Sequence, residues 1–396
     1  MKRPALRFKR YDGEWVNKTL ADLARVYDGV HHTPDYKTSG VMFLSVEDIV
    51  TLKSNKYISE DDFERDYKVY PEIGDVLMTR IGVIGATNVV RTTEKIAYYV
   101  SLALLKPNHI DSDFLSNLIR SPAFQKGLMN RSLLTAVPQK INKNEIGKVD
   151  AVCASDRAEQ IAIGKFFTEL DSLIEGMRVK LDKLKKLKLA CLGKMFPKKG
   201  ARVPEVRFKG FSGDWVESRF DELYTKVTEK NDFTYDTDRI ISVANMYFKN
   251  DAYITDRNYL LTYNVFKTGD IAFEGNKSKN FSHGRFVENT IGDGIISHVF
   301  DVFRPKVEYD LLYWKYAINN ERVMRDVLIR CTKQSTMMTN LVASDFLKQK
   351  ILYPSVPEQQ KIGAFFQNID NLINLQQQEL DKLSNIKSAC LSKMFA

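Results

Sequence analysis

Residues 159–196 read EQIAIGKFFTELDSLIEGMRVKLDKLKKLKLACLGKMF, and residues 358–395 read EQQKIGAFFQNIDNLINLQQQELDKLSNIKSACLSKMF. The two segments are identical at 20 of 38 positions, which is far more than chance gives. A shorter block, Arg-Phe-Lys at 7–9 with Gly-x-Trp-Val at 13–16, returns at 207–209 and 213–216. The chain is therefore a tandem duplication with a period of about 200 residues.

Each repeated segment predicts one long amphipathic helix. Apolar residues recur at alternating spacings of four and three, which is the seam of a coiled coil. We expect the spacer and subunit interface at Phe166, Phe167, Leu170, Ile174, Met177, Leu181 and Leu184, and at Phe365, Phe366, Ile369, Ile373, Leu380 and Leu383. Gln376 replaces Met177 on the second seam, where it either fixes register or faces water. Such helices, each roughly 57 Å long, would pack antiparallel as a spacer.

Between the helices lie short alternating apolar segments, typical of strands, each set followed by a helix-like stretch. The predicted fold class is α+β, with two globular domains separated by two long antiparallel coiled-coil helices in a pseudo-twofold tandem repeat. The expected boundaries are 1–157, 158–200, 201–356 and 357–396. The helix-like stretches fall near 113–129 and 310–330.

Polar loops between the strands are the candidate DNA-binding segments, because Arg, Lys, Asn, Gln, Ser and Thr contact phosphates and base edges. The alternative is that they are ordinary solvated loops. The candidates are His32, Thr33, Lys37, Thr79, Arg80, Gln139, Lys140 and Lys143 in the first domain, and Asn276, Lys277, Lys279, Ser282, His283, Arg285, Lys333, Gln334 and Ser335 in the second.

Composition restricts the function classes. The net charge of +9 favours a polyanionic partner. No apolar run has the length of a membrane span and the N-terminus lacks a secretory signal, so we expect a cytoplasmic protein with no membrane partner. Four scattered cysteines and five histidines show no metal-ligand spacing, and no nucleotide-binding loop is present. We therefore expect no catalytic site, no metal and no cofactor in this chain.

Taken together, the sequence resembles the specificity (S) subunit of type I restriction-modification systems. The matching residues are YDGVHHTP at 27–34, GVMFLSVEDI at 40–49, GDVLMTRIG at 74–82, and the Glu-Gln pairs at 159–160 and 358–359. The duplicated architecture extends the resemblance over the whole chain. The second domain lacks the His-x-Thr-Pro segment, which leaves open which of its loops reads DNA.

The resemblance implies two target-recognition domains that each read one half of a bipartite, asymmetric site in double-stranded DNA. It also implies that the long helices dock two methylation subunits, with restriction subunits as further partners. S-adenosylmethionine, ATP and Mg²⁺ would then be bound by those partners, and this chain would be non-catalytic. The competing interpretation is a duplicated coiled-coil scaffold that binds proteins rather than DNA. Steep loss of DNA affinity with added salt distinguishes the two.

Overall fold

The computed structural model describes residues 3–133, 135–249, 254, 256–278, 281–334 and 338–395. Two compact units divide the chain. Unit 1 comprises residues 1–179 and 378–396, and unit 2 comprises residues 180–377. Both long helices therefore contribute to both units.

Unit 1 is built on a four-stranded antiparallel sheet in the order β2-β8-β5-β6. Strands β1 and β9 pair beside it, and a third sheet has the order β4-β3-β7. The elements before the long helix are β1 (Trp15–Thr19), α1 (Leu20–Leu23), β2 (Ala24–Asp28), β3 (Val41–Leu44), η1 (Val46–Asp48), β4 (Tyr57–Ile58), α2 (Glu60–Asp66), β5 (Val76–Thr79), β6 (Thr87–Val89), β7 (Ile96–Tyr98), β8 (Leu102–Pro107), α3 (Ser112–Arg120), α4 (Pro122–Asn130), α5 (Lys143–Gly147) and β9 (Asp150–Ala154).

Unit 2 repeats this plan with the four-stranded sheet β11-β18-β15-β16 and the pair β10-β21. Its elements are β10 (Val216–Arg219), α7 (Phe220–Leu223), β11 (Tyr224–Val227), η2 (Thr237–Arg239), β12 (Ile241–Ser242), β13 (Tyr247–Phe248), η3 (Arg257–Thr262), β14 (Asn264–Phe266), β15 (Ile271–Glu274), β16 (Arg285–Glu288), β17 (Gly294–Ile296), β18 (Val302–Pro305), α8 (Leu311–Ile318), α9 (Glu321–Cys331), β19 (Thr332–Gln334), β20 (Thr339–Leu341), α10 (Ala343–Leu347) and β21 (Lys350–Tyr353). The α+β class is confirmed, with mostly antiparallel strands.

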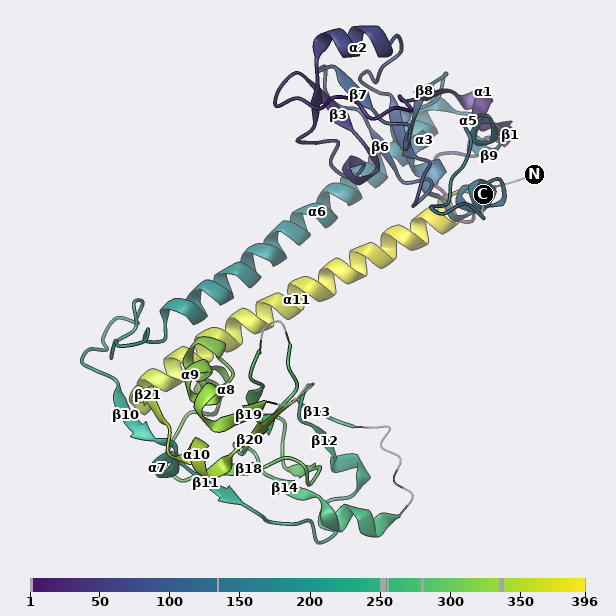
Figure 1. The fold of residues 1–396 in the computed structure, drawn as a ribbon. Coiled ribbons are helices and arrows are strands. Elements are labelled where there is room, and N and C mark those ends of the chain that lie inside the picture. The colour runs from purple at the N-terminus through teal and green to yellow at the C-terminus, as the bar shows by residue number, and fades with distance from the viewer. Residues whose placement is uncertain are drawn as a thin grey trace. The chain divides into compact units, whose positions relative to one another are not determined.

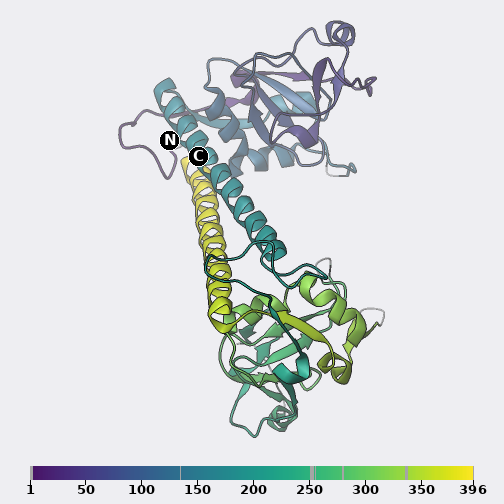
Figure 2. The ribbon, with the colours of Figure 1, turned by 90° about the vertical axis from the view of Figure 1, so that its left-hand side faces the viewer.

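The long helices are α6 (Arg157–Lys194) and α11 (Val356–Met394), close to the predicted ranges (Figure 1). In unit 1 the end of α11 returns to the start of α6, where Phe167 and Phe395 stack at 5.9 Å (Figure 2). In unit 2 the chain just after α6 meets the start of α11, where Phe196 and Phe366 stack at 6.2 Å. The two helices therefore run antiparallel, as predicted.

Ion pairs between the helices repeat in the two units. Lys188 Nζ lies 2.5 Å from Asp370 Oδ1 in unit 2, and Lys387 pairs with Asp171 in unit 1. Each residue of the first pair lies 199 positions from its counterpart in the second. The seam is buried at Phe167, Leu170, Ile174, Leu181, Phe366, Ile369 and Leu380, and half-buried at Met177, Leu184, Ile373 and Leu383. Gln376 is 4% exposed, so it does not face water.

The repeated Glu-Gln pair fastens each long helix to its unit. Arg7 donates two hydrogen bonds to Glu159 at 2.6 and 2.7 Å, and Arg207 binds Glu358 in the same way at 2.7 Å. Both carboxylates are 1% exposed. The following Gln160 accepts from the backbone N of Asp111 at 3.1 Å. The sequence identity of these blocks therefore has a structural cause, because the same buried charge is neutralised in both units.

Two predicted elements differ from the structure. Each expected helix near 113–129 and 310–330 is a pair of helices, α3–α4 and α8–α9. In unit 1 the break occurs at Ser121, whose side chain caps α4 while Pro122 occupies its first turn. In unit 2 Asn320 caps α9 in the same way. Local capping thus overrides the continuous apolar pattern on which the prediction rested.

Candidate nucleic-acid interface

In unit 1 the segment after β5 meets the segment that follows α4. Gly82 N donates to Gln139 O at 2.8 Å, and Ile141 N donates to Arg80 O at 3.0 Å. Between them Ile81 pairs with Lys140. The side chains of Gln139 and Lys140 are exposed. Two loops that the sequence placed separately therefore form one corner, which we call the unit 1 corner (residues 79–82 and 139–141).

Thr79 and Arg80 are inside this corner rather than on its surface. They are 1% and 7% exposed. Arg80 pairs with Asp28 through Nη1 and donates from Nε to Ile141 O at 3.1 Å. Thr79 Oγ1 accepts from Ala86 N at 2.9 Å. In this structure both side chains bind protein groups, and a contact of either side chain with DNA stays a prediction. Arg80 instead joins the end of β2 to the loop after α4.

Backbone hydrogen bonds bring the segment before His32 to the same corner. Val100 N donates to Val30 O at 2.9 Å, and Arg80 N donates to Ser101 O at 2.9 Å. The turn at 99–101 therefore links the end of β2 to the start of the unit 1 corner. Backbone hydrogen bonds therefore connect the segment just before His32 to the unit 1 corner.

His32, Thr33 and Lys37 are exposed, but the charges around them are balanced. His32 Nε2 lies 3.5 Å from Asp66 Oδ2, and Lys37 forms an ion pair with Asp35. The hydrogen bond to Asp35 raises the pKa of Lys37. A cation that already has a carboxylate partner attracts phosphate less strongly. Lys140 is the more available cation here, since it has no acidic partner among the described residues.

Lys143 lies apart from the exposed tip of the corner. It lines a cavity of about 750 Å³ that also contains Arg25, Arg131 and Lys148, with Asp150 as an acidic neighbour. The sequence reasoning missed Arg25 and Arg131 because neither stands in a polar loop. No signal in the sequence points to them, since the cavity brings together residues more than 100 positions apart.

Unit 2 has a corner at the corresponding place, formed by residues 274–277 and 338–340. Thr339 N donates to Gly275 O at 2.9 Å, and Asn276 pairs with Met338. A Cβ on Gly275 would lie 2.2 Å from Thr339 O, so only glycine permits this approach. Asn276 and Asn340 are exposed at this unit 2 corner. The two corners share a backbone plan and differ in side chains.

Arg285 has the same structural role in unit 2 that Arg80 has in unit 1. Its Nε lies 3.3 Å from Glu274 Oε2, it donates to Ala244 O, and its guanidinium lies 5.0 Å from the ring centre of Phe281. These contacts connect β16, which begins at Arg285, to the segments that contain Glu274, Ala244 and Phe281. Arg285 therefore positions the corner more than it offers a free charge.

The remaining predicted residues of unit 2 have varied surroundings. Asn276, Lys277, Ser282 and Lys333 are exposed, and His283 is half-buried. Ser282 Oγ donates to Glu321 Oε1 at 3.3 Å. Lys279, Ser335 and the side chain of Gln334 lie outside the described residues.

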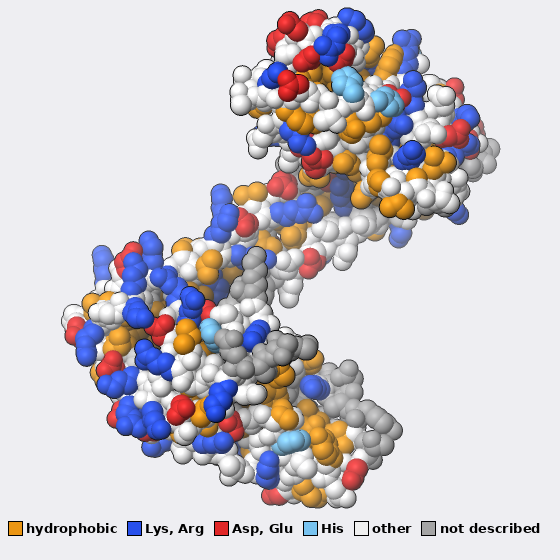
Figure 3. Space-filling model, in the orientation of Figure 1, with side chains coloured by type: hydrophobic (Ala, Val, Ile, Leu, Met, Phe, Trp, Pro, Cys, Tyr) orange, Lys and Arg blue, Asp and Glu red, His pale blue; other side chains and the backbone are white. Residues whose placement is uncertain are grey.

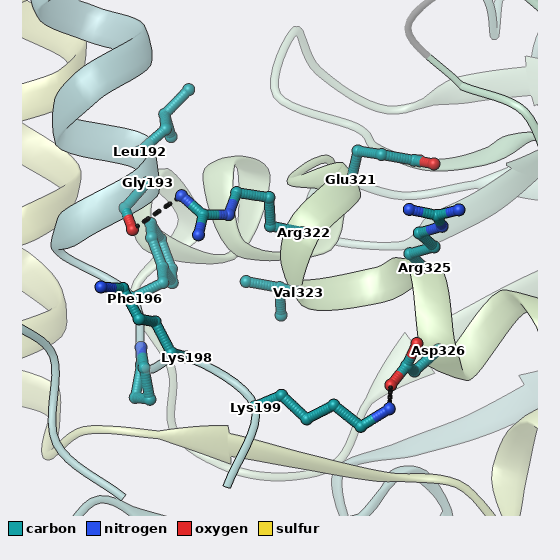
Figure 4. A pocket seen from close by; sticks show the side chains of 11 residues that line it. Leu192, Gly193, Phe196, Lys198, Lys199, Glu321, Arg322, Val323, Arg325 and Asp326 are labelled. Carbon is teal, nitrogen blue, oxygen red and sulfur yellow. Dashed lines mark hydrogen bonds and ion pairs between the residues drawn. The ribbon is translucent and has the colours of Figure 1, made fainter. Parts of the chain in front are cut away.

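A cavity of about 290 Å³ in unit 2 lies between the end of α6 and the start of α9 (Figure 4). Three of its four cations are engaged by protein groups, and one of these, Lys198, lies 2.6 Å from Glu205. Arg322 donates to Gly193 O at 3.1 Å, and Lys199 lies 2.6 Å from Asp326. Within the described part of the chain, no group of three or more His, Cys, Asp or Glu side chains could hold a metal ion. No described helix is long and apolar enough to cross a membrane.

Comparison with known proteins decides what this architecture is. The family model described as type I restriction modification DNA specificity domain matches residues 212–385. This part of the chain is similar to the type I specificity domain. Over these residues the match confirms the resemblance predicted from the sequence. The specificity domain includes the whole unit 2 corner and most of α11.

The fold of the full chain is similar to that of solved chains from type I restriction-modification systems. The S subunit of a type I restriction-modification system from M. genitalium is 13% identical, with a TM-score of 0.64 over 100% of this chain and 99% of that one. A chain from a structure on complex assembly and conformational transition of the type I R-M system is also 13% identical, with a TM-score of 0.53 over 96% and 97%. No curated protein matches the sequence.

Proposed function

We propose that the two units read the two halves of a bipartite, asymmetric DNA site through their corners. The observation that carries this proposal is that both units form a corner from the same backbone segments while exposing different side chains. Gln139 and Lys140 are exposed in unit 1, and Asn276 and Asn340 in unit 2. Similar frames with unlike side chains suit two unlike base sequences, because amide and amino groups read base edges directly.

Two matched substitutions test the assignment of each corner to one half of the site. Gln139→Ala alters only the unit 1 corner, and Asn276→Ala alters only the unit 2 corner. Sequencing of methylated DNA from cells that carry the whole system reports the recognised bases. We expect each variant to relax one half-site by about 1–3 kcal/mol per affected base and to leave the other half unchanged. Relaxation of the same half-site by both variants would contradict the proposal.

We also propose that α6 and α11 set the gap between the half-sites. Their antiparallel pairing through Lys188–Asp370 and Lys387–Asp171 supports this. Seven residues inserted between the paired positions of both helices keep the seam in phase and add about 10 Å, or about three base pairs. The methylated site should gain a gap of about that size. An unchanged gap in a folded variant contradicts the spacer role.

The same helices are proposed to dock two methylation subunits. Apolar side chains on α6 and α11 that the seam does not cover support this, since Leu173 is 57% exposed and Leu372 is 51% exposed. Phe166 and Phe365 were expected at this interface but pack edge-on against Phe8 and Phe208 of their own units. S-adenosylmethionine, ATP and Mg²⁺ are assigned to partner subunits, including restriction subunits where present. Titration of purified methylation subunit into the chain should reach two per chain.

A further inference from the structure

The positive charge of the protein is concentrated in one short stretch. Residues 180–199 contain eight lysines and one aspartate, a net charge of +7, while the whole chain carries +9. The directly corresponding parts of the two repeats are 180–196, with six lysines and one aspartate, and 379–395, with three lysines and two acidic residues. The two repeats are otherwise alike in this region. The charge therefore distinguishes the unit 2 part of the helix pair from the unit 1 part.

Three of these lysines are exposed and without an acidic partner. Lys180, Lys183 and Lys185 form no ion pair within the described part of the chain. The cations near the end of the stretch differ, because Lys198 lies 2.6 Å from Glu205 and Lys199 is paired with Asp326. Lys and Arg side chains also crowd the surface of unit 2 around the end of α6 and α9 (Figure 3). The unpaired charge thus lies on α6 itself.

Exposed leucines accompany these lysines. On α6, Leu187 is 48% exposed, and on α11, Leu372 and Leu375 are 51% and 58% exposed. At about 100° per residue, Lys180, Lys183 and Leu187 lie to one side of the buried α6 seam. Leu372 and Leu375 are rotated away from the buried α11 seam in the same direction about the helix axis as the α6 residues are from theirs.

Because the helices are antiparallel, equal offsets place these residues on one face of the pair. The Lys188–Asp370 ion pair sets the register, so that Leu375 is level with Lys183 and Leu372 with Lys186. We call these five residues (Lys180, Lys183, Leu187, Leu372 and Leu375) the lysine–leucine face.

We propose that the lysine–leucine face binds an acidic amphipathic helix of a methylation subunit, and that this site is electrostatically distinct from its counterpart in unit 1. The inference rests on the proposed docking function and adds the chemistry of the partner. Apolar residues at helical spacing favour a helix as the occupant, since a phosphate backbone offers nothing to pack against leucines. The unpaired lysines require that the facing side of this helix carries Glu or Asp.

The surface of unit 1 that corresponds to the lysine–leucine face lies on the same pair of helices but has a different charge. Glu379 stands in place of Lys180, and Gly176 stands in place of Leu375. Lys382 and Ile386 line a shallow cavity of about 550 Å³ on this part of α11. Two identical partner helices would therefore meet one basic and one mixed surface. Binding at the unit 2 site should be tighter at low salt and should weaken more as salt is added.

The repeat supplies a matched pair of variants. Lys180→Glu combined with Lys183→Glu reverses the unit 2 face, and Glu379→Lys gives the unit 1 face the unit 2 charge. Both sites are exposed, so folding should persist, and thermal unfolding of the full chain checks it. Purified methylation subunit is titrated into each chain, and native mass spectrometry counts the bound copies at several salt concentrations. DNA binding is measured in parallel.

In the double Lys→Glu variant we expect one of the two sites to weaken on the order of tenfold at low salt, while the other is unchanged. In Glu379→Lys the weaker site should tighten. Unchanged affinity at both sites overturns the proposal, as does loss of DNA binding with subunit binding intact, which would identify a phosphate contact. Absence of methylation-subunit binding by the unsubstituted chain would instead overturn the docking function itself.

Discussion

The substitution Arg80→Ala tests whether Arg80 holds the unit 1 corner in place or contacts DNA directly. The substitution removes the ion pair to Asp28 and the hydrogen bond to Ile141 O at 3.1 Å. Hydrogen bonds that involve a charged group contribute about 1.5–3 kcal/mol each when buried. Asp28 remains 25% exposed, so water partly replaces its partner. We therefore expect unit 1 to lose about 3 kcal/mol of unfolding free energy.

The salt dependence of DNA affinity distinguishes the loss of a phosphate contact from the loss of a structural contact. Each phosphate contact that is lost lowers the slope of log affinity against log salt by about 1. Lys140→Ala should lower this slope and leave stability unchanged, because its side chain is exposed. Arg80→Ala should weaken binding by at least about tenfold without changing the slope, since the residue neutralises no phosphate. Arg80→Lys keeps the charge but cannot make both contacts, so it should resemble Arg80→Ala.

Hydrogen exchange of the unit 1 backbone amides in increasing urea measures the stability of unit 1. Fluorescence anisotropy with labelled duplex DNA at four salt concentrations measures affinity and slope. A slope that falls by about 1 in Arg80→Ala, together with unchanged stability, would refute the positioning role. That result would make Arg80 a phosphate-binding residue, as its sequence context alone predicted.

Two further substitutions test the packing of unit 2. Gly363→Ala should destabilise unit 2 by about 1–3 kcal/mol in urea unfolding, because a Cβ there would lie 2.6 Å from both Asp310 Oδ1 and Tyr313 N. A gain in stability would show that α8 shifts to accommodate the added methyl group. Glu288 is 2% exposed with both carboxylate oxygens unpartnered among the described residues, and burial raises its pKa well above the usual value. Its folded-state pKa exceeds the unfolded one, so stability should fall by about 1.4 kcal/mol per pH unit above about pH 4.3, until the folded-state pKa is reached. Glu288→Val, which copies Val89 of unit 1, should remove this slope, and a persistent slope would assign it to another group.

The sequence predicted the repeat, the antiparallel long helices and the α+β class, because these depend on periodicity and internal identity. It did not separate contact residues from positioning residues. Thr79 and Arg80 have the residue types of a DNA-contacting loop, yet both are buried, since Asp28 and the loop after α4 lie beside them. Tertiary neighbours distant in sequence decide this, and no local pattern encodes them.

A different limit applies to the Glu-Gln pairs. Their sequence resembles that of type I specificity subunits, and the structure gives them a physical role. Glu159 and Glu358 are each 1% exposed and bound by an arginine about 150 residues earlier in the chain. The Arg-Phe block and the Glu-Gln pair recur together because each unit needs both partners of one buried ion pair.

Sequencing of methylated adenines in cells that contain the complete system tests two-unit recognition most directly. We expect one site with two unlike half-sites at a constant gap. Asn276→Ala should relax only one of these half-sites. A single uninterrupted site, or a change in both halves on Asn276→Ala, would contradict it.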